Sequence, residues 1–407
     1  MLSYKYTARD AATGKKVSAE VQASSEQAAA KLLRDQGLSP IEIKPMVGGL
    51  GNPLSKFKNR IRAKDKILFS RQMSTLLNAG LPLLQSLRTV ANQTQNKAFK
   101  IVIMEVISDI EAGSALSVAL GKYPNVFNKI YISLVAAGEV SGTLDKSLER
   151  LATQQEKDAE LISKVRGAMV YPIIVLVVMG AVVTFMLVTV MPQVKELYAG
   201  LGSGAQLPLV TRAMLLISDM MTKYWYILVI VAIIGGFFFS RWARTLGGKR
   251  VVDRVKMHGP LLGPLFMKMY MARFARTGAT LVSSGVPLIQ VLEITSDSIN
   301  NFHIEASLHR AIEKVKGGKA LSETLTNDPN FLTLVPDMLR IGEQSGAIEQ
   351  MLAKTADYYE KEVDNQVKTI STIIEPIMMV LLGVIAFIIV AAVLLPIYSL
   401  AGKGISV

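Results

Sequence analysis

The chain has 407 residues, 50% of them hydrophobic, and 45 Lys and Arg against 32 Asp and Glu give it a net charge of +13. Few soluble domains combine so many apolar residues with so much basic charge, and this composition favours a membrane protein. The chain contains no cysteine, which excludes disulfides and thiolate metal sites. Its first residues are polar rather than apolar, so no cleavable signal peptide is expected and the first membrane span should direct insertion.

The N-terminal 45 residues predict a small α+β module. Alternating apolar and polar residues favour strands, and Gly and Ser at the segment ends favour turns and a helix cap. Residues 46–63 are rich in glycine and basic residues and predict a flexible linker. In chain order the expected elements are a strand at Tyr4–Ala8, a turn at Gly14, a strand at Lys16–Ala23, a helix at Ser25–Gln36 capped by Ser24 or Ser25 and ended by Gly37, and a strand at Pro40–Ile43.

An internal repeat organises the rest of the chain. The pattern of Phe69–Leu87 recurs 205 residues later at Phe274–Leu292, and that of Gly113–Asn125 recurs at Gly318–Asn330 with the same offset. These matches stay in register over long stretches, which chance does not explain. The chain therefore contains two copies of one structural unit.

Each copy also includes an apolar stretch. Beyond these blocks the second copy is one residue shorter than the first, so equivalent residues of the two copies lie 204 positions apart. This offset relates Pro172 to Pro376 and Pro192 to Pro396, at the start and end of two long apolar segments. Within the copies, apolar residues recur at helical spacings. Each copy therefore predicts a bundle of about six short helices, the last of which continues into the membrane. In the first copy the later helices are expected at Lys97–Glu111, Ala115–Gly121, Asn128–Gly138 and from about Gly142 onward.

Two glycine-proline turns predict tight helical hairpins. Gly80 is expected to end one helix and Pro82 to lie at the first turn of the next, and Gly285 and Pro287 repeat the pattern. No strand is expected after residue 45.

Three segments without formal charge predict transmembrane helices, at residues 167–194, 224–240 and 376–398. A helix of about 20 apolar residues crosses a bilayer core. The second segment is shorter, but Tyr224, Trp225 and Tyr226 stand at its start as interfacial anchors.

The distribution of Lys and Arg predicts the orientation. Residues 1–166 carry 24 Lys and Arg against 15 Asp and Glu, and residues 241–276 carry 9 against 1, whereas residues 195–223 carry 3 against 2. By the positive-inside tendency, the first two of these regions are cytoplasmic, and the loop at 195–223 and the C-terminal tail face the outside. The basic excess beside membrane ends favours anionic lipid as a partner over nucleic acid.

A Gly-Glu-x-Ser-Gly motif is the sharpest local signature. It lacks the Lys and the preceding strand of a phosphate-binding loop. A corner between two helices explains it: the first Gly ends one helix, Ser or the second Gly caps the next, and Asp145 or Glu349 favours the positive end of the new helix. The glutamates could instead contact a partner or a second subunit. The residues are Gly138, Glu139, Ser141 and Gly142 in the first copy and Gly342, Glu343, Ser345 and Gly346 in the second.

A second pair of motifs lies at the membrane entrance. Tyr171-Pro172 and Glu375-Pro376 begin the first and third spans, where a proline removes a helix hydrogen bond and commonly produces a kink. Glu375 can reach headgroup water or meet a positively charged partner group. A helix continuous from Gly142 to Met191 extends on the order of 75 Å, and the second copy repeats this rod.

Enzymatic motifs are not found. The histidines His258, His303 and His309 show no metal-ligand spacing with carboxylates, and no Gly-x-Ser-x-Gly, Walker A or paired-carboxylate pattern occurs. Three spans without a central ionisable residue do not predict a transporter either. We expect no catalytic, cofactor or metal site.

Taken together, the repeated bundles, the hairpin and corner motifs, the two membrane-entry prolines and the three spans resemble the GspF/PilC family of inner-membrane components of type II secretion and type IV pilus systems. The resemblance covers nearly the whole chain. It implies a non-enzymatic platform that couples a cytoplasmic hexameric assembly ATPase to pilins or pseudopilins. It also implies other inner-membrane partners and a homo-oligomer, with a dimer favoured.

The expected fold is mainly α, a polytopic membrane protein with three transmembrane helices, two homologous cytoplasmic six-helix bundles and a small α+β N-terminal module. The expected function is a type IV pilus platform, with a type II secretion platform or a regulatory membrane scaffold as alternatives. The expected segments are the module at 1–45, a linker at 46–63, the first bundle at 64–166, a span at 167–194, an external loop at 195–223, a span at 224–240, a basic cytoplasmic linker at 241–268, the second bundle at 269–375, a span at 376–398 and an external tail at 399–407.

Overall fold

The computed structural model describes residues 2–10, 16–23, 26–35, 37–45, 60–199, 209–260 and 262–403. The chain forms two compact units. The first comprises Met1–Leu76 and Gly80–Ser114, and the second comprises Leu77–Ala79 and Ala115–Val407. The expected turn at Gly14, the Ser24 or Ser25 cap and most of the linker lie outside the described residues.

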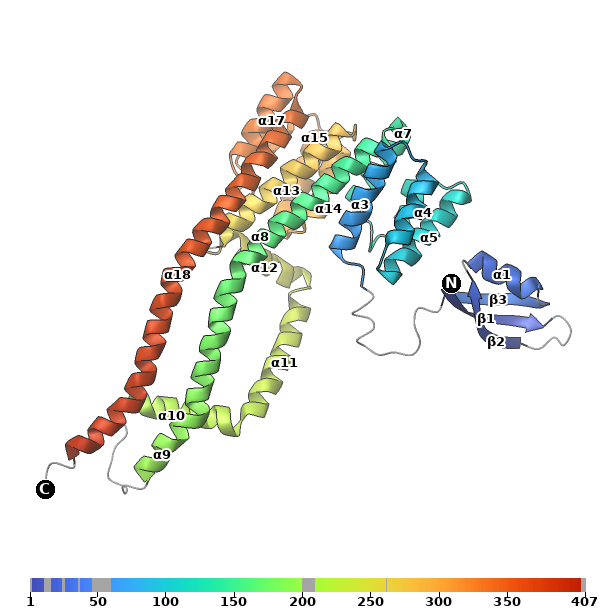
Figure 1. Ribbon diagram of the computed structural model, residues 1–407. Helices are drawn as coiled ribbons and strands as arrows, with labels where there is room; N and C mark the ends of the chain where they lie inside the picture. The colour runs from blue at the N-terminus through green and yellow to red at the C-terminus, as the bar shows by residue number, and fades with distance from the viewer. Residues whose placement is uncertain are drawn as a thin grey trace. The chain divides into compact units, whose positions relative to one another are not determined.

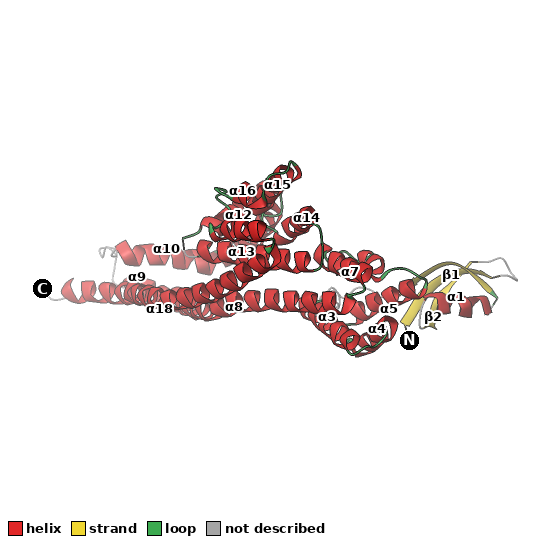
Figure 2. Cartoon of the chain, turned by 90° about the horizontal axis from the view of Figure 1, so that it is seen from above, coloured by secondary structure: helices red, strands yellow, loops and turns green. Residues whose placement is uncertain are grey.

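The N-terminal module is a three-stranded antiparallel sheet with one helix. Its strand order is β2-β1-β3, and a bulge interrupts the pairing of β1 with β3 next to Thr7. Tyr6 and Ala8 on β1 and Leu33 on the helix are buried together. Within the described part of the chain, strands occur only here (Figure 2). The elements are β1 (Leu2–Asp10), β2 (Lys16–Ala23), α1 (Glu26–Asp35) and β3 (Leu38–Pro45).

Three further helices complete the first unit. Phe69 and Phe99 are buried and meet edge to face with ring centroids 5.4 Å apart. Asn96 caps the third helix by accepting from the Phe99 N–H, and its amide group donates to Asp65 at the start of the first. These helices are α3 (Ala63–Asn78), α4 (Leu83–Gln93) and α5 (Lys97–Glu111).

The second unit begins with the rest of the first repeat. A short helix and a medium helix lead into a 42-residue helix, α8, which continues through a wide π turn into a last short helix. Asn128 caps α7 by accepting from the Tyr131 N–H. The elements are α6 (Leu116–Gly121), α7 (Lys129–Ser141), α8 (Leu144–Phe185), η1 (Met186–Val190) and α9 (Met191–Ala199).

Between the repeats, the described residues form three helices. The segment expected as an external loop contains α10 (Leu209–Lys223), and α11 (Trp225–Trp242) is the second apolar span. The segment expected as a basic linker contains α12 (Leu246–His258). Its buried Asp253 accepts a hydrogen bond from the Phe302 N–H, which ties α12 to the second repeat.

The second repeat ends in the longest helix of the structure, the 56-residue α18. At 1.5 Å per residue it extends about 84 Å. The elements of the second repeat are α13 (Gly263–Ser283), α14 (Leu288–Ile299), α15 (Phe302–Lys316), α16 (Leu321–Leu325), α17 (Leu334–Ser345) and α18 (Ile348–Lys403).

Among the residues that the structure describes, three helical segments are long and apolar enough to cross a membrane: Leu144–Glu196, Trp225–Trp242 and Ile348–Leu394. Their large apolar side chains point away from the protein, as Phe238 and Phe387 do with 67% and 72% of their surface exposed. A helix of this length with apolar side chains on every face is typical of a helix surrounded by lipid. The chain is therefore a multi-pass membrane protein.

The main core of the second unit combines both repeats. Leu161 of α8 is buried with α13 and α18 residues such as Phe274 and Val363. In Figure 1 the N-terminal parts of α8 (green) and α18 (red) converge on α13. Helix α8 of the first repeat therefore packs into the bundle of the second.

Candidate functional site at the junction of the two repeats

The glutamate of the first corner motif caps a neighbouring helix. Helix α6 begins after Ala115, whose side chain cannot accept a hydrogen bond. The Glu139 carboxylate takes this role and accepts from the N–H groups of Leu116 and, at 2.9 Å, Ser117. A carboxylate at this position satisfies open donors and favours the positive end of the helix.

The second copy repeats this arrangement. Helix α16 begins after Ala320 and has no cap from its own sequence. Glu343 accepts from the Leu321 N–H at 2.6 Å and from the Ser322 hydroxyl at 2.5 Å. Both copies thus use a glutamate from the following helix as the missing cap, a contact that explains why motif and short helix recur together.

The glycines of the corner have two different tasks. Gly138 lies inside α7 rather than at its end, and a Cβ there would lie 2.6 Å from the Ser147 Oγ and 3.0 Å from the Leu144 Cα. Gly342 likewise allows the Ile348 backbone to approach, since a Cβ would lie 2.9 Å from its Cα. The first glycine of each motif is needed for helix packing.

The second glycine of the corner ends the helix. Gly142 and Gly346 have φ of 70° and 68°, in the left-handed region that side chains disfavour. Ser141 and Ser345 donate to carbonyls of their own helix, those of Ala137 and Ile341 at 2.7 Å, and do not cap the next helix.

The two predicted hairpin turns have the same geometry. Gly80 and Gly285 have φ of 83° and 78°. The N–H after Gly80, that of Leu81, donates to the Leu76 carbonyl at 3.0 Å, which closes the end of α3. Pro82 and Pro287 are the residues just before α4 and α14, and not the first residues within them.

The membrane-entry prolines do not interrupt their helices. Pro172 lies inside α8 with its side chain buried, and Pro376 lies inside α18. Tyr171 and Glu375 beside them are exposed. Each rod is therefore helical from the corner motif into its apolar span.

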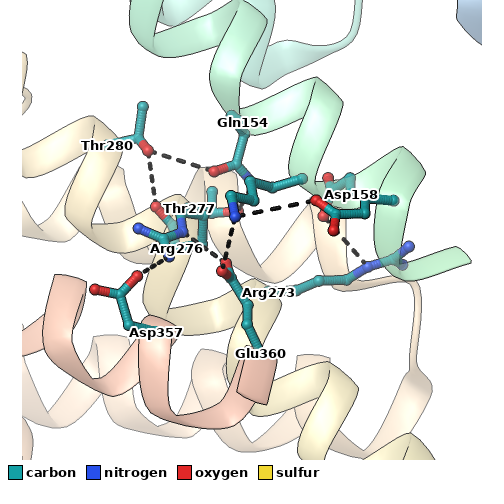
Figure 3. Close-up of polar contacts among 10 residues, drawn as sticks. Gln154, Asp158, Arg273, Arg276, Thr277, Thr280, Asp357 and Glu360 are labelled. Carbon is teal, nitrogen blue, oxygen red and sulfur yellow. Dashed lines mark hydrogen bonds and ion pairs between the residues drawn. The ribbon is translucent and has the colours of Figure 1, made fainter. Parts of the chain in front are cut away.

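A polar network joins α8 to the second repeat, and Figure 3 shows how its side chains converge from α8, α13 and α18. Gln154 of α8 is buried, donates to Thr277 and accepts from Thr280, both on α13 and both at 3.4 Å. One turn further along α8, Asp158 lies 3.7 Å from the guanidinium of Arg273. These contacts fix the rotation of α8 against α13.

Arg276 connects α13 to α18 within the same network. Its Nε donates to Glu360 at 2.8 Å and its Nη2 to Asp357 at 2.5 Å (Figure 3). Lys157 of α8 also lies 3.9 Å from Glu360. Arg276 is the counterpart of Arg71 in the repeat, so its position belongs to the repeated pattern.

Ion pairs extend the junction toward the membrane. Lys164 of α8 contacts Asp364 of α18 at 2.8 Å, and Lys268 of α13 contacts Glu362 at 2.8 Å. At the other end of α8, Arg150 donates at 2.5 Å to the Ser283 carbonyl, which is open at the end of α13. The two rods are thus linked at several levels before their apolar spans begin.

Burial and neighbouring groups shift the pKa values of charged side chains at the junction. Partial burial raises the pKa of the Asp158 carboxyl, although nearby Arg273 opposes the effect. Hydrogen bonds to Asp364 and Glu160 raise the pKa of Lys164. The hydrogen bond from Lys268 lowers the pKa of Glu362.

The family follows from comparison with known proteins. The family model described as type II secretion system (T2SS), protein F, matches residues 69–192 and again 274–396. The model of the N-terminal domain of type II secretion system protein F matches residues 1–44. The chain belongs to the GspF/PilC family. The two matches include both corner motifs, both hairpins and the prolines at 172, 192, 376 and 396, so the internal duplication is a family feature.

Individual GspF/PilC relatives match over almost their whole length. The chain is 41% identical over 403 residues to the type IV pilus assembly protein PilC of Thermus thermophilus, covering 98% of each protein. It is 36% identical over 392 residues to PilC of Myxococcus xanthus, covering 96% of this chain and 93% of that protein. It is 34% identical over 409 residues to type II secretion system protein F of Pseudomonas aeruginosa, covering 98% and 99%.

One histidine of this GspF/PilC chain lies in a small cluster of possible metal ligands. Donor atoms of Asp297, Glu305 and His309 lie within 4.8 Å of one another. Glu305 and His309 are one turn apart on α15, a spacing that the sequence interpretation overlooked. Both carboxylates already have cationic partners, Lys129 at 2.5 Å from Asp297 and Lys249 at 3.7 Å from Glu305. The cluster therefore serves as a set of ion pairs that links α7, α12, α14 and α15.

Proposed function

We propose that this GspF/PilC protein is the inner-membrane platform of a type IV pilus machine and has no catalytic activity of its own. In this proposal a hexameric cytoplasmic ATPase moves the helical bundles, and the motion reaches pilin subunits in the membrane. The observation that carries the proposal is the continuity of α8 and α18 from the repeat junction into the apolar spans. A continuous helix transmits displacement along its axis without a flexible joint.

The junction supports a specific form of this coupling. Gln154 and Asp158 join α8 to α13, and Arg276 joins α13 to α18. Because both rods bond to the same helix, rotation of one displaces the other. We infer that α8 and α18 move as a single body, so that force applied to either bundle reaches both spans.

Orientation and lipid contacts are part of the same proposal. The basic N-terminal region and α12 lie in the cytoplasm, and the ends of the first and third spans face the periplasm. Arg250 and Arg254 on α12 share an exposed face with Val251 and Val255, and α12 follows the end of the α11 span closely. A basic and apolar helix face beside a membrane span suits an anionic bilayer surface.

A pilus role is favoured over a secretion role by sequence identity. Identity is 41% and 36% to the two PilC proteins and 34% to the type II secretion protein F. The secretion platform, with pseudopilins in place of pilins, is the second candidate. We further propose that the chain acts as a homo-oligomer, a dimer in the simplest case, beside other inner-membrane assembly components.

Deletion and complementation test the proposal. The gene is deleted in its own host, and surface fibres and secreted folded enzymes are both measured. Loss of fibres with normal secretion is expected, and the wild-type gene should restore the fibres. Loss of secretion with normal fibres would assign the chain to a secretion system. Normal fibres and normal secretion would contradict a platform role.

A flexible insertion tests the coupling itself. A Gly/Ser stretch inserted near Lys164 should abolish fibre assembly while membrane insertion and abundance stay normal. Normal fibres in this variant would contradict transmission through a rigid α8.

A further inference from the structure

One face of α10 is buried against the ends of two membrane helices. Thr211, Leu215 and Ser218, at helical spacings of four and three, are 0%, 7% and 2% exposed. Leu215 joins an apolar cluster with Met191, which follows the π turn of the first span, and with Ala392 of α18. Helix α10 has no counterpart in the repeat, yet it contacts the same region of both copies.

Pro192 leaves an open carbonyl in the first of these helices. In the π turn η1 the N–H of Met191 donates to the carbonyl of Met186, five residues back. The next donor in this pattern is residue 192, which would serve Leu187, but proline has no N–H. The buried Ser218 hydroxyl donates to the Leu187 carbonyl instead.

Pro396 leaves an equivalent carbonyl open in α18. An α-helical N–H at residue 396 would donate to Ala392, four residues back, and proline cannot supply it. The buried Thr211 hydroxyl lies 3.4 Å from the Ala392 carbonyl oxygen and donates to it. Pro192 and Pro396 are equivalent positions of the two repeats.

We propose that α10 is a clasp that holds the first and third membrane helices together through these two hydroxyls. The duplicated prolines create one open acceptor in each repeat, and Thr211 and Ser218 lie seven residues apart, two helical turns, to serve both from one face. An unpaired carbonyl away from water is costly, so each hydroxyl favours the closed arrangement. Thr211 and Ser218 are positioning residues for the two spans.

The clasp complements the junction described above. The junction links α8 and α18 before they enter their apolar segments, and the clasp links them at the far end of those segments. With both ends joined, the two spans form a frame of fixed width. The existence of the clasp is independent of the proposed function, and only its use in moving subunits rests on that function.

The test uses the purified full-length protein in lipid nanodiscs. Because the chain has no cysteine, Phe185→Cys and Val390→Cys, at exposed positions of the two spans, accept spin labels for a distance measurement. Ser218→Ala and Thr211→Val each remove one hydroxyl with little change in shape. We expect each to broaden the distance distribution and to lower Tm by about 1–3 °C.

A matched control and a rescue make the test specific. Thr222→Val removes a hydroxyl that bonds within α10, to the Ser218 carbonyl at 2.8 Å, and should leave the distance distribution unchanged. Pro192→Ala supplies the missing N–H, so Leu187 gains a donor in its own helix and Ser218→Ala should then have little further effect. The proposal would be overturned if Ser218→Ala had the same effect with and without Pro192→Ala. It would also be overturned if the Thr211→Val and Ser218→Ala variants kept the distance distribution of the unsubstituted protein. Fibre assembly is not needed for either readout, so failure of the proposed function would leave the result interpretable.

Discussion

Removing the carboxylate of Glu343 should destabilise the second bundle measurably. Glu343 accepts from the Leu321 N–H at 2.6 Å and from the N–H and hydroxyl of Ser322 at 3.3 and 2.5 Å. Leu321 and Ser322 are only 2% and 3% exposed, so water cannot replace the lost acceptor easily. Hydrogen bonds to charged groups contribute about 1.5–3 kcal/mol and helix caps about 0.5–2 kcal/mol.

From these values, we expect Glu343→Ala to lower the free energy of unfolding by about 2–4 kcal/mol. Glu343→Gln, which keeps one amide oxygen as an acceptor, should lower it by about 1–2 kcal/mol. The assay is thermal unfolding of the purified full-length protein in detergent. Glu349→Gln is the matched control, because this glutamate is exposed in the first turn of α18, where the helix dipole stabilises it by about 1 kcal/mol or less.

The same variants separate capping from partner recognition. If Glu343 acts as a cap, fibre assembly should fall only as far as protein abundance and Tm fall. Normal stability with lost fibres would show that the carboxylate serves a partner. A Tm of Glu343→Ala equal to that of Glu349→Gln would refute the capping account.

Three further predictions concern packing, pH and lipid. Gly138→Ala should lower the free energy of unfolding of the protein by about 1–3 kcal/mol, because the Cβ of the alanine would lie 2.6 Å from the Ser147 Oγ. A lower Tm is the readout. Asp158→Asn should raise Tm at pH 7 and have less effect near pH 4. The pKa of Asp158 is higher in the folded state than in the unfolded state, so folding favours the protonated carboxyl. The ionised carboxylate therefore destabilises the folded protein as pH rises above the unfolded-state pKa of about 4. Replacing Arg250 and Arg254 by Gln should reduce the stabilisation gained on moving from neutral to anionic nanodiscs, measured as the difference in Tm.

Each of these predictions has a contradicting result. Gly342→Ala should reproduce the Gly138→Ala effect in the second copy, and no loss of stability in either would contradict the packing argument. If the gain in Tm of Asp158→Asn over the wild type were larger near pH 4 than at pH 7, the expected pH dependence would be contradicted. Lys319→Gln, at an exposed position away from α12, is the control for the lipid experiment. If it reduced the stabilisation by anionic nanodiscs as much as the α12 replacements do, the net charge of the protein and not the α12 face would account for the lipid effect.

Most of the helical framework was predictable because its signals are local or repeated. The Lys97–Glu111 helix has the expected bounds, and the glycines at 80 and 285 have the left-handed conformation that their turns require. Three apolar segments long enough to span a membrane follow from composition alone. Duplication strengthened the signals of the hairpin glycines and of the first and third apolar segments, because each has a counterpart in the other copy.

The contacts between segments were not predictable in the same way. Helix α12 was expected as a linker because its basic residues dominate the composition, although Asp253 and Met257 are buried. The glutamate caps join residues about 22 positions apart, and only the lack of a capping side chain at Ala115 and Ala320 gave a hint. The junction around Arg276 depends on three helices meeting, which periodicity within one helix cannot show.

If α8 transmits motion as a stiff helix, lowering its stiffness without changing its length should impair fibre assembly. Ile162, Ser163 and Arg166 are exposed residues of α8 on either side of Lys164, at the end of the junction nearest the first apolar span. Replacing all three by Gly weakens the helix by about 1 kcal/mol per residue relative to replacing all three by Ala. Surface fibres are counted per cell and normalised to the protein in the membrane. We expect a severalfold loss of fibres in the Gly variant and near-normal numbers in the Ala variant. Equal fibre numbers in the two variants at equal abundance would contradict it.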